Sequence, residues 1–271
     1  MIKILATIDE YMDFVHEINS DPNFSEPMLS SETQMQRNLT NASKAPANKV
    51  FGVFDNGEMI GLFVFLILDD ESYMEMLVGL SRAEEAYDEI LHYLKENYKG
   101  YEVDFVYNPH NYLLHNSLSA MKASFEKEQQ KLILVNDVEY KHDKEIILYN
   151  SQYKEPYIVM HSKDVYWTAE KVLDALDKFR VILAVEDGEV VGYIDITYTS
   201  EENEPYDIFV KEEYRGKGYE KAMLAKAIEL NKPRGMMLLM DADETLLMEE
   251  YESLGFVKSE RENSVTAHVL L

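Results

Sequence analysis

An internal repeat is the feature that most constrains how this chain can fold. Segments 53–61 and 184–192 each contain an apolar strand, an Asn-Gly or Asp-Gly pair and a second apolar strand, and Gly188 follows Gly57 by 131 residues. Asn-Gly and Asp-Gly tolerate the positive φ angles of a type I′ turn, so each segment predicts a β-hairpin. The same offset places Phe256 on Phe125. The sequence therefore predicts one fold that is used twice.

Hydrophobic periodicity gives both halves a similar order of elements. In the first half it predicts helices at 8–18, 31–39, 83–98 and 110–123, and strands at 49–54, 58–68, 72–80, 102–107, 125–135 and 145–149. In the second half it predicts a joining strand at 157–160, helices at 168–178, 218–230 and 245–254, and strands at 180–186, 189–199, 205–210, 236–240, 256–260 and 265–270. Each half is therefore expected to be an α/β (α+β) domain in which helices flank a mixed, mostly antiparallel sheet. Asn150 and Pro156 interrupt the patterns, which predicts domains at 1–150 and 151–271.

Charge and composition exclude several classes of function. The chain of 271 residues has 51 acidic and 26 basic residues and a net charge of −25, so it lacks the basic face of a nucleic-acid-binding protein. It has no cysteine, which excludes disulfides, thiolate metal sites and cysteine nucleophiles. No stretch approaches the roughly 18 apolar residues of a membrane span, and the N-terminus has no signal-peptide pattern. We therefore expect no nucleic-acid or membrane partner and a cytoplasmic location.

A basic turn that contains two glycines is the most informative motif for chemistry. Arg215-Gly216-Lys217-Gly218 follows the strand predicted at 205–210 and precedes an amphipathic helix. The glycines allow the backbone N–H groups of 216–220 to converge, and the helix N-terminus adds partial positive charge. The pattern predicts a binding site for a diphosphate, with a solvated turn as the alternative.

This turn and a second motif resemble those of the GCN5-related N-acetyltransferase (GNAT) superfamily. Arg215 and Gly218 match its acetyl-CoA-binding motif, Arg/Gln-x-x-Gly-x-Gly/Ala, and Tyr251 to Phe256 match its Tyr-x-x-Leu-Gly-Phe helix end. The resemblance covers 157–271, while the first half shares only its element order, its hairpin and Phe125, which implies a tandem GNAT-like protein with a degenerate N-terminal half. The resemblance implies acetyl-CoA as co-substrate and no metal. The cofactor-binding residues that it implies are Ile208, Phe209, Val210, Arg215, Gly216, Lys217, Gly218, Tyr219 and Glu220.

The resemblance also implies a mechanism, in which an acetyl group passes directly from the thioester to a primary amine of a small molecule or peptide. Tyr251 matches the tyrosine that often protonates the leaving thiolate in this family, although packing alone is the alternative. Glu204 lies where histone-modifying members carry their catalytic glutamate, and a period of two places it on one strand face with Tyr206 and Ile208. The alternative is that residues 201–204 form a solvated acidic loop.

Several positions depart from the family pattern. Glu220 replaces a Gly or Ala, and its carboxylate should weaken CoA binding although it suits the helix dipole. Glu244 and Leu247 replace the family's Asn and Ala. In the first half, the offset places Glu85 and Tyr87 at the positions of the two turn glycines. We therefore expect the first half to lack a cofactor site and to flank the second domain, shape the acceptor pocket or form the interface of a homo-oligomer.

The sequence also contains a motif that resembles another class of enzyme. Asp241-Ala242-Asp243-Glu244-Thr245 resembles the Asp-x-Asp-x-Thr motif of haloacid-dehalogenase-type phosphatases, but the 26 residues after Thr245 are too few for the rest of such a domain. We expect Asp241 and Asp243 to end a strand and Thr245 to cap the next helix. The seven histidines show no zinc-binding spacing. Tyr166 and Trp167 are candidates for the border of the acceptor site. A catalytically weak or inactive GNAT-like binding or regulatory protein, and a scaffold, stay open as alternatives.

Overall fold

The computed structural model describes residues 1–136, 138–163, 165–199 and 202–271, so Glu201 of the predicted acidic loop lies outside the described residues. The chain forms two compact units. Unit 1 comprises Met1–Gln130 and Ser259–Leu271, and unit 2 comprises Lys131–Lys258. These units differ from the predicted domains, because residues 131–150 lie in unit 2 and residues 259–271 lie in unit 1.

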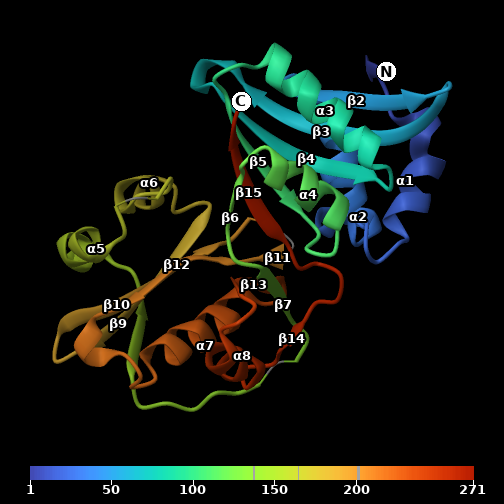
Figure 1. Ribbon diagram of the computed structural model, residues 1–271. Coiled ribbons are helices and arrows are strands. Elements are labelled where there is room, and N and C mark those ends of the chain that lie inside the picture. The colour runs from blue at the N-terminus through green and yellow to red at the C-terminus, as the bar shows by residue number, and fades with distance from the viewer. Residues whose placement is uncertain (137, 164, 200–201) are drawn as a thin grey trace. The chain divides into compact units, whose positions relative to one another are not determined.

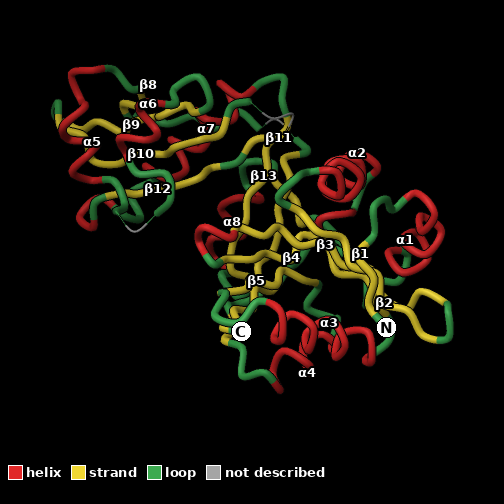
Figure 2. The backbone as a smooth tube through the Cα atoms, turned by 90° about the horizontal axis from the view of Figure 1, so that it is seen from above, coloured by secondary structure: helices red, strands yellow, loops and turns green. Residues whose placement is uncertain are grey.

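Unit 1 is a seven-stranded sheet with helices on both faces (Figures 1 and 2). Its strands are β1 (Ile2–Ile4), β2 (Asn48–Asp55), β3 (Glu58–Leu68), β4 (Tyr73–Ser81), β5 (Glu102–Tyr107), β6 (Ser124–Phe125) and β15 (Val265–Leu270). Its helices are α1 (Met12–Asn19), α2 (Glu32–Gln34), which continues as a π-helix over Met35–Asn41, α3 (Glu84–Asn97) and α4 (Tyr112–Ala120). The strand order is β1-β2-β3-β4-β5-β15-β6, and only the pairing of β4 with β5 is parallel within the described residues. Apolar side chains of α3 and α4 pack on one face, and those of α1 and the π-helix pack on the other.

Unit 2 contains two four-stranded sheets, with orders β12-β10-β9-β8 and β11-β13-β7-β14. Its strands are β7 (Gln129–Leu134), β8 (Glu145–Leu148), β9 (Phe179–Glu186), β10 (Glu189–Thr197), β11 (Glu202–Asn203), β12 (Pro205–Val210), β13 (Gly235–Asp241) and β14 (Phe256–Lys258). Its helices are α5 (Lys154–Met160), α6 (Ala169–Asp174), α7 (Tyr219–Asn231) and α8 (Thr245–Glu252). Side chains of α7 and α8 form one core with Ile194 and Leu238, whereas α5 and α6 form another core with Leu183 and Tyr193.

The chain exchanges one strand between its two units. The sequence predicts a single strand at 125–135, but the structure divides it into β6 and β7. Residues 131–134 of β7 lie in unit 2, where β7 is placed between β13 and β14. The last strand of the chain, β15, lies between β5 and β6 of unit 1 and buries Ala267 and Val269 there. The strand predicted at 145–149 in the first half is β8, which pairs with β9 of unit 2. This pairing and the strand exchange are the reasons that the structural units cross the predicted boundary.

Most local predictions agree with the structure, and one strand prediction is wrong. Both hairpin turns have positive φ angles, 49° and 92° at Asn56 and Gly57 and 51° and 83° at Asp187 and Gly188, as a type I′ turn requires. The strand predicted at 157–160 is helix α5 instead. Pro156 lies in the first turn of α5, where the missing N–H group is tolerated, and Tyr157 is fully buried. None of the helices among the described residues has the length and apolar character that a bilayer span requires.

Candidate active site

Strand β12 has an edge that is available for a ligand. The N–H group of Lys211 donates to the carbonyl oxygen of Val191 on β10 at 2.9 Å, and Val210 lies opposite Gly192 in the antiparallel register. Hydrogen-bonded and non-hydrogen-bonded pairs alternate in such a ladder, so the peptide groups of Ile208 and Val210 face away from β10. No strand among the described residues pairs with this second edge. An extended ligand could therefore pair with β12 as an added strand does.

The two sheets of unit 2 diverge at this edge (Figure 1). The short strand β11 pairs in parallel with the start of β13, with Glu202 opposite Gly235 and Asn203 opposite Met236. The chain then enters β12, which pairs with β10 in the other sheet. The divergence of β12 from β13 leaves the peptide groups of Ile208 and Val210 outside both ladders.

The turn after β12 has the backbone geometry of an anion-binding site. Gly216 and Gly218 have φ angles of 67° and 82°, a conformation that residues with a side chain rarely adopt. Gly218 is the N-cap residue of the 13-residue helix α7, so the first N–H groups of this helix have no partner within it. Unpaired N–H groups and the helix dipole favour an anion at this position. The residues present here therefore fit a diphosphate.

The two basic side chains of the turn are exposed. The Nε atom of Arg215 donates to the carbonyl oxygen of Val210 at 3.1 Å, which fixes the guanidinium beside the open edge of β12. The Nζ atom of Lys217 lies 5.2 Å from the centre of the Tyr214 ring. Both cations can therefore approach an anion at the turn.

Two predicted binding residues of the turn have other contacts. The side chain of Tyr219 is buried, and its hydroxyl donates to Glu186 at 2.6 Å, so only the backbone of Tyr219 is available to a ligand. The carboxylate of Glu220 lies in the first turn of α7. Burial and the charge of Glu250 raise the pKa of Glu220, and Arg215 opposes them. Glu220 thus places an acidic side chain in the first turn of α7, next to the position that a diphosphate would occupy.

Tyr251 lies on α8 and is half-buried against the core that α7 and α8 share. Burial, with smaller contributions from the charges of Glu250 and Glu220, raises its pKa to about 12. Tyr251 packs against the same core as Tyr219, which lies in the first turn of α7. A phenol with this pKa is protonated at neutral pH and can donate a proton.

Glu204 and its predicted neighbours are arranged differently from the sequence prediction. Glu204 precedes β12, and its main chain pairs with Thr197 at 2.9 and 3.0 Å. Because β12 rises about 3.3 Å per residue, roughly 20 Å of strand separates Glu204 from Val210. The prediction that Tyr206 and Ile208 share one face is wrong, since Tyr206 packs in the core of α5 and α6 and Ile208 in the core of α7 and α8. A β-bulge opposite Asp195 and Ile196 places the extra residue at Tyr206 and breaks the period of two.

The sequence reasoning missed a buried polar network on the α5 and α6 side of β10 and β12. The Nε2 atom of His161 lies 2.8 Å from Oδ2 of Asp195 and 3.9 Å from Oδ2 of Asp207. The hydroxyl of Tyr157 donates to Asp195 at 2.7 Å, and the hydroxyl of Tyr193 donates to Asp207 at 2.6 Å. Of the five side chains, only that of Asp207 is appreciably accessible, at 17%. The one signal in the sequence is Asp195, an acidic residue inside the apolar pattern of β10.

Tyr166 and Trp167 lie in the segment between α5 and α6. Tyr166 is exposed, and the backbone N–H group of Trp167 donates to the hydroxyl of Tyr206 at 3.1 Å. This contact holds the segment against β12 near the β-bulge. A role of Tyr166 and Trp167 at the border of an acceptor site stays a prediction.

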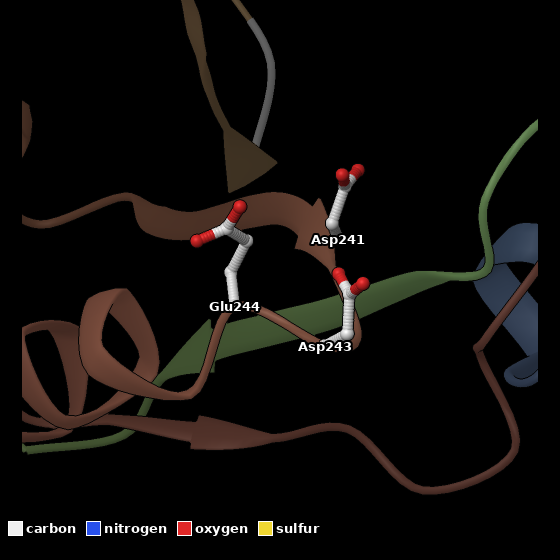
Figure 3. Close-up of side chains that lie close together, drawn as sticks. All are labelled: Asp241, Asp243 and Glu244. Atoms are coloured by element: carbon white, nitrogen blue, oxygen red, sulfur yellow. The ribbon is translucent and has the colours of Figure 1, made fainter.

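An acidic cluster follows strand β13 (Figure 3). Carboxylate oxygens of Asp241, Asp243 and Glu244 lie within 4.8 Å of one another, and Asp243 and Glu244 are exposed. Asp241 ends β13 as predicted, but the N-cap of α8 is Glu244, so the prediction that Thr245 caps this helix is wrong. Because water screens exposed charges, such a cluster needs no ion to be stable.

Unit 1 has a different connection at the corresponding place. Its strand β4 reaches α3 through only Arg82 and Ala83, and exposed Glu84 and Glu85 occupy the first turn of the helix. Strand β4 pairs with β5 only as far as Met76, so Gly79 lies beyond this pairing. The backbone N–H group of Gly79 donates to the buried carboxyl group of Glu26 at 3.0 Å. Unit 1 thus has carboxyl groups both on the edge of its strand and at the helix N-terminus.

Unit 2 therefore has an α/β fold in which strand β12 diverges from β13. The free edge of β12 is followed by an anion-binding turn at the N-terminus of α7. Residues 177–258 match the family model described as an acetyltransferase (GNAT) domain. This range contains β12, the turn and Tyr251. The chain therefore carries a GNAT domain in unit 2, and acetyl transfer is the class of chemistry that this family supports.

Solved structures of low sequence identity have the same fold. A GCN5-related N-acetyltransferase from Sphaerobacter thermophilus aligns with a TM-score of 0.68 at 13% identity over 99% of this chain and 94% of its own. A GNAT-family acetyltransferase from Colwellia psychrerythraea gives 0.57 at 10% identity over the whole of both chains. A tandem GNAT protein from the clavulanic acid biosynthesis pathway gives 0.55 at 12% identity over 99% of this chain and 98% of its own. Among proteins with curated functions, no sequence relative matches this chain.

Proposed function

We propose that this protein is an acetyl-CoA-dependent N-acetyltransferase that acetylates a primary amine of a small molecule or peptide by direct transfer. One observation carries this proposal: the open edge of β12 leads directly into the glycine-containing turn at the N-terminus of α7. A ligand with an extended amide-bearing arm and a diphosphate needs these two features side by side. Both lie inside the range that matches the GNAT domain.

The residues that would hold acetyl-CoA divide between the strand and the turn. Ile208 and Val210 offer peptide groups to the arm, and Phe209 between them supports the strand through its packing on the opposite face. The diphosphate would be bound by the backbone N–H groups of 216–220 and by the side chains of Arg215 and Lys217. When bound, acetyl-CoA supplies the thioester whose acetyl group is transferred.

The proton transfers fall to residues of unit 2. Tyr251, protonated at neutral pH, would give its proton to the leaving thiolate. Glu204 precedes β12 at the end opposite to the turn, where the reacting end of an extended ligand would arrive, and would accept the proton of the amine through water. No cysteine is available to form an acyl-enzyme, which agrees with direct transfer.

Glu220 favours a second candidate function, that of a catalytically weak or inactive GNAT-like binding or regulatory protein. Its carboxylate lies in the first turn of α7 and would repel a diphosphate. In this alternative the fold is kept and the cofactor is bound weakly. Under either function we propose a cytoplasmic protein without nucleic-acid or membrane partners, in which unit 1 forms the interface of a homo-oligomer.

Titration of the full chain with acetyl-CoA in a calorimeter distinguishes the two functions. The enzyme predicts saturable binding and turnover with amine acceptors. Binding without turnover supports the alternative, and no heat at millimolar acetyl-CoA excludes the enzyme. Glu220→Gln should tighten binding about tenfold, since it removes one like charge beside the phosphates. Glu229→Gln changes the net charge equally at the other end of α7 and is the matched control; an equal effect of both variants would contradict a local role of Glu220.

A further inference from the structure

Unit 2 contains a cavity of about 540 Å³ between α5 and the adjoining ends of β10 and β12. Its volume lies in the range of sites for small molecules. One side is formed by α5 and the turn before it, and the other side by the two strands. The residues of the lining are Tyr153, Pro156, Val159, Met160, Gly188, Glu189, Val190, Phe209 and Lys211.

The wall that α5 forms is apolar although water reaches it. Pro156 and Val159 lie three residues apart and therefore on one side of the helix, and Val159 is 76% exposed. Across the cavity, Val190 is buried and Phe209 stacks on the buried ring of Tyr193. Exposed apolar side chains that face a cavity are stabilised when the apolar part of a ligand removes them from water.

Lys211 adds a positive charge to this apolar lining. Its backbone N–H group donates to Val191 at 2.9 Å, which fixes the residue at the end of β12, and its side chain is half-buried. Among the described residues, no carboxylate lies within ion-pair distance of its ammonium group. Acidic residues outnumber basic ones by 51 to 26 in this chain, so acidic partners are plentiful. The ammonium group therefore stays available to an anion that comes from outside the chain.

The other charges near the cavity favour an anion with a single negative charge. The guanidinium of Arg215 lies 5.8 Å from the centre of the Phe209 ring and adds positive potential at this end of β12. Glu189 is exposed and also lines the cavity, so it would repel a phosphate dianion more strongly than a carboxylate. The remaining lining is apolar and fits a hydrocarbon chain.

We propose that this cavity binds an alkyl carboxylate, with the carboxylate at Lys211 and the hydrocarbon chain between α5 and Phe209. The chain would cover Pro156 and Val159, and the carboxylate would pair with the ammonium group. This site is separate from the proposed acetyl-CoA site, because its lining contains none of the residues 215–220 and neither Ile208 nor Val210. The inference therefore does not depend on acetyltransferase activity.

Titration of the full chain with sodium octanoate, without acetyl-CoA, tests this proposal. We expect saturable binding that Lys211→Met weakens by roughly threefold or more, because the variant removes the charge and keeps an unbranched side chain. Lys154→Met, at the exposed start of α5 and outside the lining, removes the same charge and should leave the affinity unchanged. Acetate has the same charge without the chain, and its binding should be weaker by about tenfold or more.

A second measurement on the unchanged protein locates the ligand. With the methionine methyl groups labelled with ¹³C, octanoate should give nuclear Overhauser contacts to the methyl group of Met160, whose signal is assigned through Met160→Leu. Binding of octanoate without these contacts would overturn the proposal, as would the lack of saturable binding. Equal losses of affinity in Lys211→Met and Lys154→Met would show a response to net charge alone and would also refute a site at Lys211.

Discussion

Replacing Glu26 with glutamine should remove a large pH dependence from the stability of unit 1. Glu26 is 3% exposed, and its Oε1 atom has no hydrogen-bond partner among the described residues. Burial raises its pKa from 4.5 to about 8, although hydrogen bonds from the backbone N–H groups of Gly79 and Met28 oppose the shift. The folded state therefore binds a proton on Glu26 more tightly than the unfolded state does.

The sign and size of the effect follow from this pKa. Because the folded pKa is the higher one, the stabilisation is complete below pH 4.5 and is lost as the pH rises to about 8. At 1.36 kcal/mol per pKa unit, the loss reaches about 5 kcal/mol above pH 8. Glutamine resembles the protonated acid and does not titrate, but its amide donors cost about 1–3 kcal/mol if they lack acceptors. Glu26→Gln should therefore be about 2–4 kcal/mol more stable than wild type at alkaline pH.

Urea unfolding at a series of pH values between about 5 and 9, followed by hydrogen exchange of the β4 amides, measures this difference in unit 1. Glu58→Gln, on the exposed hairpin, is the control for the change in net charge. Glu75, whose pKa burial also raises, contributes the same slope to every variant and cancels. If wild type and Glu26→Gln lose stability in parallel over this range, the reasoning from burial of Glu26 is refuted.

Three further predictions concern the site and the strand exchange. Tyr251→Phe should lower turnover about a hundredfold and leave acetyl-CoA affinity nearly unchanged in calorimetry, because it removes only a proton donor; unchanged turnover would remove Tyr251 from the mechanism. Deletion of residues 259–271 should abolish the hydrogen-exchange protection of the β5 amides that face β15, because β15 pairs with β5 along its whole length, whereas β4 still covers the other edge; retained protection of those amides would contradict the strand exchange. Burial lowers the pKa of His161, but its hydrogen bonds, above all that to Asp195, raise it overall from 6.5, so unit 2 should lose stability as the pH rises above about 6.5, and Asp195→Asn should reduce that slope in urea unfolding.

Features that depend on neighbouring residues were predictable from the sequence. The two hairpins follow from Asn-Gly and Asp-Gly, whose positive φ angles are a property of the dipeptide. Strand β12 has the predicted bounds, and the turn after it has two glycines because its backbone needs positive φ. The roles of Arg215 and Tyr251 remain predictions from the resemblance, since sequence spacing gives a position but no contact.

Features that depend on distant partners were not predictable. The residues 157–160 have β-forming side chains, but burial of Tyr157 against the sheet favours a helix. The β-bulge at Tyr206 shifts the strand by one residue and so reverses which face each later side chain occupies. The His161 network joins an α5 end to two strands, and no local pattern indicates that these residues meet.

The strand exchange shows why the repeat predicted the fold better than it predicted the domains. Each repeat contributes a last strand, but β7 completes a sheet of unit 2 and β15 completes the sheet of unit 1. Two strands with the same alternating pattern can form the same hydrogen bonds with a neighbouring strand. The sequence therefore does not indicate whether β7 or β15 joins the sheet of a given unit. A fragment of residues 151–271 would lack β7 and would leave β15 without β5 and β6. The smallest piece that holds the complete GNAT sheet is therefore the unit at 131–258, which begins inside the first predicted domain.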